Sequence, residues 1–333
     1  MILVTGGTGL VGSHLLFELS KTNEQIRATI RKTSNIATVQ NLFNAYSPEG
    51  NTLFQRIQWV DTDIESYDSL CDILKGVEEV YHCAAMVSFD PRQSRRMLEV
   101  NVLGTAKLVD ASIHCGVKRF CQVSSVAALG SAPDGEMVNE ETPWGKSKGK
   151  SGYAISKFFS EMEVWRGQEE GLNVVVVNPS VIIGPCRWNT SSGLIFGTIA
   201  KGFPFYTLGT TGYVDVRDVV ASMLTAMQME KWGSKYLLNG ENLSHKHVFD
   251  IIAQSMGKKP PYIYVKPWMT NIAWKLIGLL SLITKKSPSI TRDTARSAHS
   301  KTYYSSAKAT DELGINFRSV SEAIANTTRV GSI

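Results

Sequence analysis

The sequence predicts an α/β fold: a doubly wound parallel sheet, with a smaller and mostly C-terminal part added to it. Short apolar runs rich in β-branched residues alternate with segments of helical period over the first half of the chain. Such alternation implies right-handed crossovers between parallel strands. The length of 333 residues, with 43% hydrophobic and 20% charged residues, suits one large α/β domain with an appendage, or two ordinary domains.

The first strand is Ile2–Val4, and it runs straight into a glycine-rich turn at residues 5–12. Apolar residues then recur at helical spacing over residues 10–19. Strand, glycine turn and helix in this order are typical of a Rossmann-type dinucleotide site, where free N–H groups at the helix start bind a pyrophosphate. An ordinary tight turn between strand and helix is the alternative.

Each glycine of this turn has an expected task. We predict that Gly6 and Gly7 turn the chain with positive φ, and that Gly9 lets the backbone approach the phosphates without a Cβ. Gly12 is expected to let the helix pack closely on the strand.

The second predicted strand, residues 25–30, ends at Arg31 and Lys32. NAD sites usually have an acid here that accepts a hydrogen bond from the ribose 2′-hydroxyl. Cations suit a 2′-phosphate instead, which an acid would repel. The sequence therefore predicts NADP(H) in preference to NAD, unless the two cations are merely exposed charges.

The alternation continues with strands and helices at regular intervals. His82 lies inside an apolar strand run, so we interpret it as a packed histidine and not as a catalytic base. We expect strands at 57–60, 79–85 and 118–125, a helix at about 66–74, and an amphipathic segment from Asn101 to about Cys115.

After residue 125 the pattern changes. Residues 140–152 are polar, contain Pro and Gly, and predict a mobile loop over the site. We expect helices at 153–165, 191–201 and 247–256, one opening at 214–220, and strands at 173–177 and 236–238. The predicted division is a nucleotide-binding domain at 1–178, then a mainly substrate-binding part at 179–333, with sheet elements returning at about 214–240.

The net charge of +5 does not indicate nucleic-acid binding, but the charge is unevenly distributed. Residues 258–308 hold ten Lys and Arg against the single acid Asp293. They include the most apolar stretch, 271–284, which is too short for a bilayer span and is closed by Lys285-Lys286. A core or lid helix is expected there, and an interfacial membrane helix is the alternative. We predict no metal site, and five cysteines without C-x-x-C pairing suggest reduced thiols in the cytoplasm.

The pattern Y-x-x-x-K occurs three times, at Tyr153, Tyr262 and Tyr304. On a helix, residues four apart share a face, whereas on a strand they lie about 13 Å apart. Residues 262–266 alternate like a strand, and Tyr304 lies in a polar, serine-rich stretch. Only Tyr153 and Lys157 lie on a predicted helix that follows a strand ending in Ser124-Ser125.

These side chains suit carbonyl reduction. Hydride transfer to a carbonyl produces an alkoxide that needs a proton. Tyr153 can supply it if Lys157 stabilises the phenolate, and Lys157 can also reach the nicotinamide ribose. A serine hydroxyl would hold and polarise the carbonyl oxygen.

At these residues the chain resembles the extended short-chain dehydrogenase/reductases of the NAD-dependent epimerase/dehydratase superfamily. It is most similar to the dihydroflavonol reductase and 3β-hydroxysteroid dehydrogenase-like branch. Besides the glycine turn, the resemblance rests on Asp63-Ile64, His82-Cys-Ala-Ala85, Asn101-Val-Leu-Gly-Thr105, Asn178-Pro-Ser-Val-Ile-Ile-Gly-Pro185, Tyr213-Val-Asp-Val-Arg-Asp218 and Ser306-Ala-Lys-Ala-Thr-Asp-Glu-Leu-Gly314.

The resemblance implies a site and an assembly. It makes Ser125, five residues before Gly130, the catalytic serine beside Tyr153 and Lys157, and it implies a homodimer through the helices that carry Asn101 and Tyr153. The expected cofactor-binding residues are Gly6, Thr8, Gly9, Leu10, Val11, Gly12, Arg31, Lys32, Asp63, Ile64, Ala84, Ala85, Met86, Asn101, Tyr153, Lys157, Pro179 and Val181.

One departure from the family bears on the substrate. Sugar-nucleotide epimerases usually have arginine where Asn178 stands, so an NADPH-dependent reductase of a bulky, partly apolar ketone or aldehyde is favoured. A nucleotide-sugar epimerase or dehydratase, and a non-catalytic NADP-binding regulator, stay open as alternatives. The expected pocket lies among residues 86–89, 128–132, 185–196 and 268–283, and Phe89, Trp188, Phe196 and Trp268 either line it or belong to the core.

Overall fold

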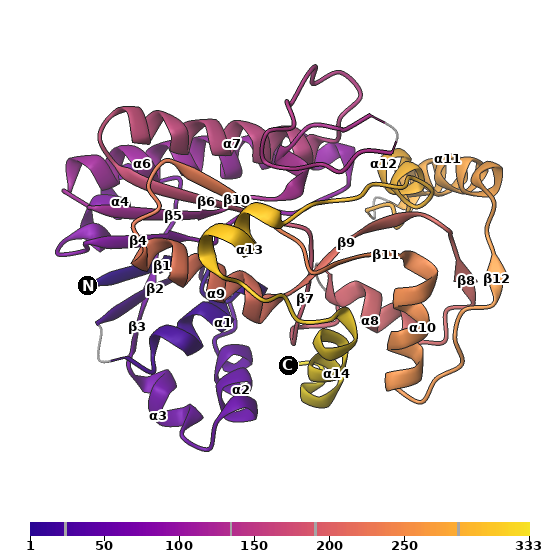
Figure 1. Cartoon of the computed structure of the whole chain (residues 1–333), viewed down its shortest axis with the longest axis horizontal. Coiled ribbons are helices and arrows are strands. Elements are labelled where there is room, and N and C mark those ends of the chain that lie inside the picture. The colour runs from indigo at the N-terminus through magenta and orange to yellow at the C-terminus, as the bar shows by residue number, and fades with distance from the viewer. Residues whose placement is uncertain (23–24, 134, 190–191, 285–286) are drawn as a thin grey trace.

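A computed structural model describes residues 1–22, 25–133, 135–189, 192–284 and 287–333. Its centre is a seven-stranded sheet in the order β3-β2-β1-β4-β5-β6-β10, with every neighbouring pair parallel (Figure 1). The strands are β1 (Ile2–Thr5), β2 (Ile26–Ile30), β3 (Ile57–Asp61), β4 (Glu79–His82), β5 (Arg119–Val123), β6 (Asn173–Pro179) and β10 (Ser234–Leu238). The predicted fold class is confirmed.

Strand β6 shows why the sheet is covered on both faces. Val175 and Val177 pack into one apolar cluster, while Val174 and Val176 pack into another on the opposite face. All four valines are fully buried, as expected for a strand without a polar side.

Helices supply the other half of each cluster. On one face, α1 (Leu10–Leu19), α2 (Ala37–Tyr46), α3 (Gly50–Gln55), α9 (Val216–Gln228) and α13 (Ala307–Leu313) contribute apolar side chains. The other face is covered by α4 (Tyr67–Leu74), α6 (Gly104–His114) and α7 (Gly152–Glu169).

A smaller part follows β6 and lies beside the carboxyl ends of the strands (Figure 1). It has a three-stranded sheet of β7 (Val181–Ile183), β9 (Thr210–Asp215) and β11 (Glu241–Ser244), and a pair of β8 (Phe205–Tyr206) with β12 (Ile263–Tyr264). Its helices are α8 (Gly193–Ala200), α10 (His245–Ser255), α11 (Pro267–Thr284), α12 (Arg292–Ser297) and α14 (Val320–Val330).

Several predicted boundaries need correction. The helix predicted to open at 214–220 is present but starts two residues later, at Val216, because β9 continues to Asp215 and the Asp215 side chain then caps α9 at the Arg217 N–H. The apolar helix starts at Pro267, four residues before the predicted start. Residues 190–191 and 285–286 of the predicted segments lie outside the described residues.

Candidate active site

The glycine turn between β1 and α1 is tightly packed. Gly6 has a φ of +68°, and a Cβ built on it would lie 2.7 Å from the Ala84 nitrogen. A Cβ on Gly12 would collide with the Gly6 carbonyl oxygen, so α1 can lie this close only with glycine there. The prediction of positive φ at Gly7 is wrong: a Cβ there would instead crowd the Leu16 side chain at 2.9 Å.

The start of α1 leaves backbone N–H groups available to an anion. Gly9 is the N-cap and makes no side-chain cap, so no side chain of its own competes for the N–H groups of Leu10, Val11 and Gly12. Thr8 is half-buried beside this N-terminus. Uncapped donors at a helix start, reached across glycine, fit a dinucleotide.

Two buried hydroxyls without partners follow strands of the central sheet, at its carboxyl edge. Thr62 directly follows β3 and Ser180 follows Pro179 at the end of β6, and neither hydroxyl oxygen has a partner in the described structure. Buried polar groups are normally satisfied, so a bound group at the carboxyl edge of the sheet would explain both. Val181 lies next to Ser180 and opens β7.

The expected adenosine end lies beyond β2 and β3. Arg31 and Lys32 are exposed after β2, in a turn where the Ser34 N–H donates to the Arg31 carbonyl oxygen at 2.7 Å. Asp63 is exposed and accepts from the Glu65 N–H at 2.9 Å. Ile64 packs against Gly104 of α6, where a Cβ would lie 3.1 Å from it.

Asn101 fixes the backbone after β4. Its Oδ1 accepts from the Met86 N–H at 2.7 Å, and its Nδ2 donates to the Met86 carbonyl oxygen at 2.9 Å. Nδ2 also donates to the Ser156 hydroxyl of α7 at 3.0 Å. Asn101 is 2% exposed, within a π-helical turn over residues 98–103, so the structure gives it a positioning contact on the segment that contains Ala84 and Ala85.

Helix α7 and the end of β5 bring the three predicted catalytic residues together. Tyr153 lies in the first turn of α7, which Ser151 caps by accepting from the Ala154 N–H at 3.1 Å. Burial raises the pKa of Tyr153, and a hydrogen bond with the Ser125 side chain opposes that rise. The serine hydroxyl and the phenol are therefore adjacent, as a shared carbonyl oxygen requires.

Lys157 lies one helical turn after Tyr153 and is almost fully buried. Its ammonium donates to the Val123 carbonyl oxygen at 2.8 Å. Burial lowers the pKa of Lys157 to about 8, while the negative charge of Glu161 acts in the opposite direction.

Glu161 is a site residue that the sequence analysis missed. It is 2% exposed, and its Oε2 accepts from the Ser124 hydroxyl at 2.6 Å and from the Asn178 amide at 2.8 Å. Its Oε1 accepts from the Trp165 indole at 3.2 Å. The spacing gave a signal, since Tyr153, Lys157 and Glu161 recur every four residues on one helix.

Asn178, the departure from the sugar-epimerase pattern, supports the serine. It is fully buried and donates both to Glu161 and, at 3.1 Å, to the Ser125 carbonyl oxygen. The residue at this position therefore acts on the turn that carries Ser125.

The two other Tyr/Lys pairs are not built for proton transfer. Tyr262 is 73% exposed and precedes β12, as the strand-like pattern suggested. Tyr304 packs against Val138 and Leu129, and Lys308 lies over the ring of Tyr236.

The prediction that His82 packs inside the strand is confirmed. It hydrogen-bonds Thr5 at 2.7 Å and Thr105 at 2.9 Å, and burial lowers its pKa to about 3. Thr105 continues this buried network to Ser160 at 2.9 Å, so neutral polar groups connect β1, β4, α6 and α7.

The four aromatic residues expected at the pocket have different surroundings in the structure. Phe89 is half-exposed and meets the Tyr153 ring edge-on, with 5.9 Å between centroids. Phe196 is fully buried in the core and Trp188 stacks on it. Trp268 is exposed on α11. Of the four, Phe89 is the one that touches a triad residue in the described structure.

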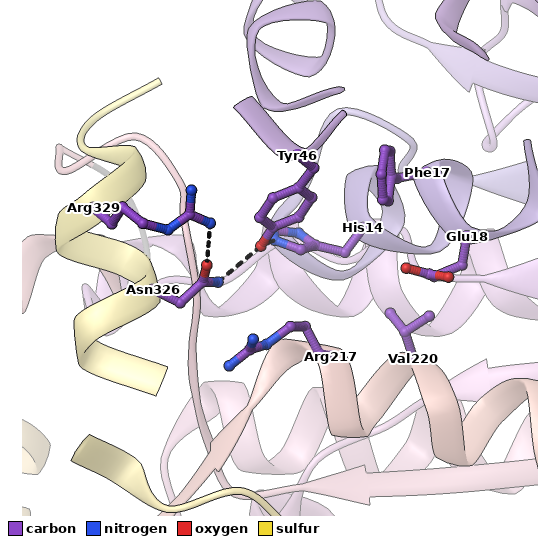
Figure 2. Close-up of a pocket in the computed structure, with 8 residues that line it drawn as sticks. All are labelled: His14, Phe17, Glu18, Tyr46, Arg217, Val220, Asn326 and Arg329. Carbon is purple, nitrogen blue, oxygen red and sulfur yellow. Dashed lines mark hydrogen bonds between the residues drawn. The ribbon is translucent and has the colours of Figure 1, made fainter. Parts of the chain in front are cut away.

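A pocket of about 190 Å³ lies on the outer side of α1 (Figure 2). The Tyr46 hydroxyl joins His14 and Asn326 there, each at 3.0 Å, and Arg329 donates to Asn326 at 2.9 Å. No predicted site residue lines it, and its charged residues Glu18 and Arg217 pair with Lys21 and Asp215 outside it. The hydrogen bonds in this pocket therefore connect α14 to α1 and α2.

Comparison with known proteins gives consistent matches. Residues 2–238 match the sequence model of the NAD dependent epimerase/dehydratase family. The chain is 31% identical to a putative dihydroflavonol 4-reductase of Synechocystis sp., covering 97% of this chain and 92% of that protein. It is 32% identical to sterol demethylase protein B of Methylococcus capsulatus, over 80% and 77% of the two chains.

Two further matches are more distant. Cinnamoyl-CoA reductase 1 of Petunia hybrida is 26% identical over 78% of each chain. The solved structure of a dTDP-glucose 4,6-dehydratase from Streptomyces venezuelae with NAD bound has a TM-score of 0.76, at 20% identity, over 99% of this chain and 96% of that one. This last likeness shows the fold.

Proposed function

The chain belongs to the NAD dependent epimerase/dehydratase family of extended short-chain dehydrogenase/reductases, and we propose that it is an NADPH-dependent reductase of bulky, partly apolar ketones or aldehydes. It is an NAD(P)-dependent oxidoreductase by its family and its reductase-named relatives. The relatives' names, a dihydroflavonol 4-reductase, cinnamoyl-CoA reductases and a sterol demethylase, support an aromatic or polycyclic substrate.

The observation that carries the proposal is the buried Lys157 one turn after Tyr153, with the Ser125 hydroxyl on the phenol. The ammonium stabilises the phenolate, so Tyr153 can give its proton to the oxygen of a carbonyl as the alcohol forms. Ser125 and Tyr153 together hold that oxygen and polarise the carbonyl bond. A bound nicotinamide dinucleotide supplies the hydride.

The choice of NADPH rests on Arg31 and Lys32. Both are exposed at the end of β2, and in the described ranges neither side chain makes an ion pair. A guanidinium and an ammonium free of acidic partners can bind a 2′-phosphate. Gly6, Gly12 and the uncapped start of α1 would hold the pyrophosphate.

The test is Tyr153→Phe, which removes the phenolic hydroxyl and keeps the ring that Phe89 contacts. Wild-type protein should oxidise NADPH with at least one member of a panel of aromatic aldehydes, flavonoid ketones and steroid ketones. The variant should lose turnover by about 10²-fold or more and still bind NADPH, as measured by the cofactor's fluorescence. Full turnover in the variant would overturn the acid assignment, and epimer formation from nucleotide sugars without net NADPH use would favour the epimerase alternative.

We also propose a homodimer. Leu98 and Leu103 on the Asn101 segment, and Phe159 and Met162 on α7, are exposed. A second copy would cover such side chains. A Phe159→Asp, Met162→Asp variant should run as a monomer in light scattering, and an unchanged mass would contradict this interface.

A further inference from the structure

Helix α11 exposes several large apolar side chains and buries two polar ones. Thr270 and Ser281 are buried, and Thr270 is hydrogen-bonded to His299 at 2.9 Å. Trp268, Leu276 and Leu279 are 61%, 57% and 61% exposed. A helix on the surface of a globular protein normally presents polar residues to water and buries its apolar ones, so this outward face needs a covering partner.

The outward apolar residues form one stripe. Trp268, Ile272, Leu276 and Leu280 follow at intervals of four, and Leu279 lies beside them. Helix α11 lies at the end of the molecule away from the seven-stranded sheet and packs mainly on α12 (Figure 1). Exposed aromatics also precede the helix, at Tyr262 and Tyr264.

The positive charge of residues 258–308 indicates which kind of partner would cover the stripe. Lys266 and Lys275 are exposed at the start and middle of α11, and residues 258–308 contain ten Lys and Arg against Asp293 alone. Two copies facing each other through this stripe would bring like charges together. A surface with anionic headgroups above an apolar interior complements both the charge and the leucines.

The segment that follows α11 contacts the segment before Arg92. Ser287, three residues after α11, hydrogen-bonds the buried carboxylate of Asp90, whose pKa is held low by Arg92 foremost and by Ser287 as well. The neighbouring Phe89 contacts the Tyr153 ring. The segment that follows α11 is therefore linked, through Asp90, to the segment that places Phe89 against the proposed catalytic phenol.

We propose that α11 binds the surface of a membrane containing anionic lipid, with its stripe buried among the acyl chains and its lysines at the headgroups. In the ranges that the structure describes, no helix has the length and apolarity to cross a bilayer, so the contact is interfacial. It brings the reductase site to the phase in which apolar carbonyl compounds dissolve.

The test is flotation of the full-length protein with vesicles of phosphatidylcholine alone, or of phosphatidylcholine and phosphatidylglycerol in equal amounts. The protein should float with the anionic vesicles, and less so at high salt. Leu276→Ser with Leu279→Ser should lower the partition coefficient by about tenfold or more, because two leucines no longer leave water. Lys266→Glu with Lys275→Glu should lower binding to the anionic vesicles specifically.

The control is Leu194→Ser, which changes a leucine of α8 that is 52% exposed and should leave flotation unchanged. A second readout is quenching of tryptophan fluorescence by brominated lipid, which should fall in Trp268→Phe. Failure of the wild-type protein to float, or equal flotation of the leucine variant, overturns the proposal. A leucine variant that changes from dimer to monomer but floats like the wild-type protein also overturns the proposal. These assays need no turnover, so their failure leaves the proposed reductase function unaffected.

Discussion

The buried carboxylate of Glu161 gives the sharpest test of how the site works. In Glu161→Gln the side chain keeps its size and loses its charge, four residues after Lys157. A carboxylate at about 6 Å from an ammonium contributes about 2–3 kcal/mol at an effective dielectric constant of about 20. If the variant loses half of this interaction energy, about 1.4 kcal/mol, the protonation equilibrium constant of Lys157 changes by about tenfold.

The effect should depend on pH. Lys157 has a pKa of about 8, and Glu161 raises it, so the variant has a lower pKa and loses the ammonium earlier as pH rises. At pH 8 a tenfold change takes the protonated fraction from about one half to about one tenth, so kcat for NADPH-dependent reduction should fall about fivefold. Near pH 6 the ammonium persists in both proteins, so the loss there should be small.

The assay is the pH profile of kcat from pH 5.5 to 9.5, with Glu161→Asp as the charge-preserving control. The alkaline limb should move to lower pH in the glutamine variant and stay in place in the aspartate variant. An equal loss of rate at every pH would show that Glu161 only supports Ser124 and Asn178, and would refute the electrostatic reasoning.

Other predictions concern the cofactor and stability. Arg31→Asp should weaken NADPH binding by about 10–100-fold in fluorescence titration and leave NADH binding within about threefold, since only the 2′-phosphate contact is lost; equal affinities in the wild type would contradict this. Gly12→Ala should abolish binding of both cofactors, because the new Cβ meets the Gly6 carbonyl oxygen, whereas Gly278→Ala, with open space around it, should bind normally. Burial lowers the pKa of His14 to about 4 and of His82 to about 3, so the unfolded chain, with histidines near 6.5, binds more protons in between. The free energy of unfolding should therefore fall by about 3 kcal/mol or more between pH 6.5 and 4 in urea titrations, and a flat profile would show that these histidines are charged when folded.

The sequence predicted the features that depend on local pattern. Apolar runs and glycines located the sheet strands and the nucleotide turn, and helical spacing separated Tyr153/Lys157 from the two other pairs. The prediction for Gly7 failed because glycine serves close packing there: a Cβ would crowd Leu16, which lies on the following helix.

What could not be predicted depends on contacts between distant residues. Glu161 is a good helix former in a polar segment of the sequence. It is a buried site residue because the fold places Ser124 and Asn178 against its carboxylate. Helices α2 and α14 were not predicted, and Tyr46 and Asn326, which join them, lie 280 positions apart. The outward stripe of α11 has the same composition as a core helix, so exposure alone distinguishes the two.

The apolar cluster under α1 has a consequence for synthesis on the ribosome. It combines Leu15 of α1 and Val175 of β6 with Tyr236 of β10 and Leu313 of α13. The hydrophobic core of the cofactor-binding half therefore cannot be completed until nearly the whole polypeptide has left the ribosome. Until then the nascent strands expose apolar surface, which favours aggregation during synthesis.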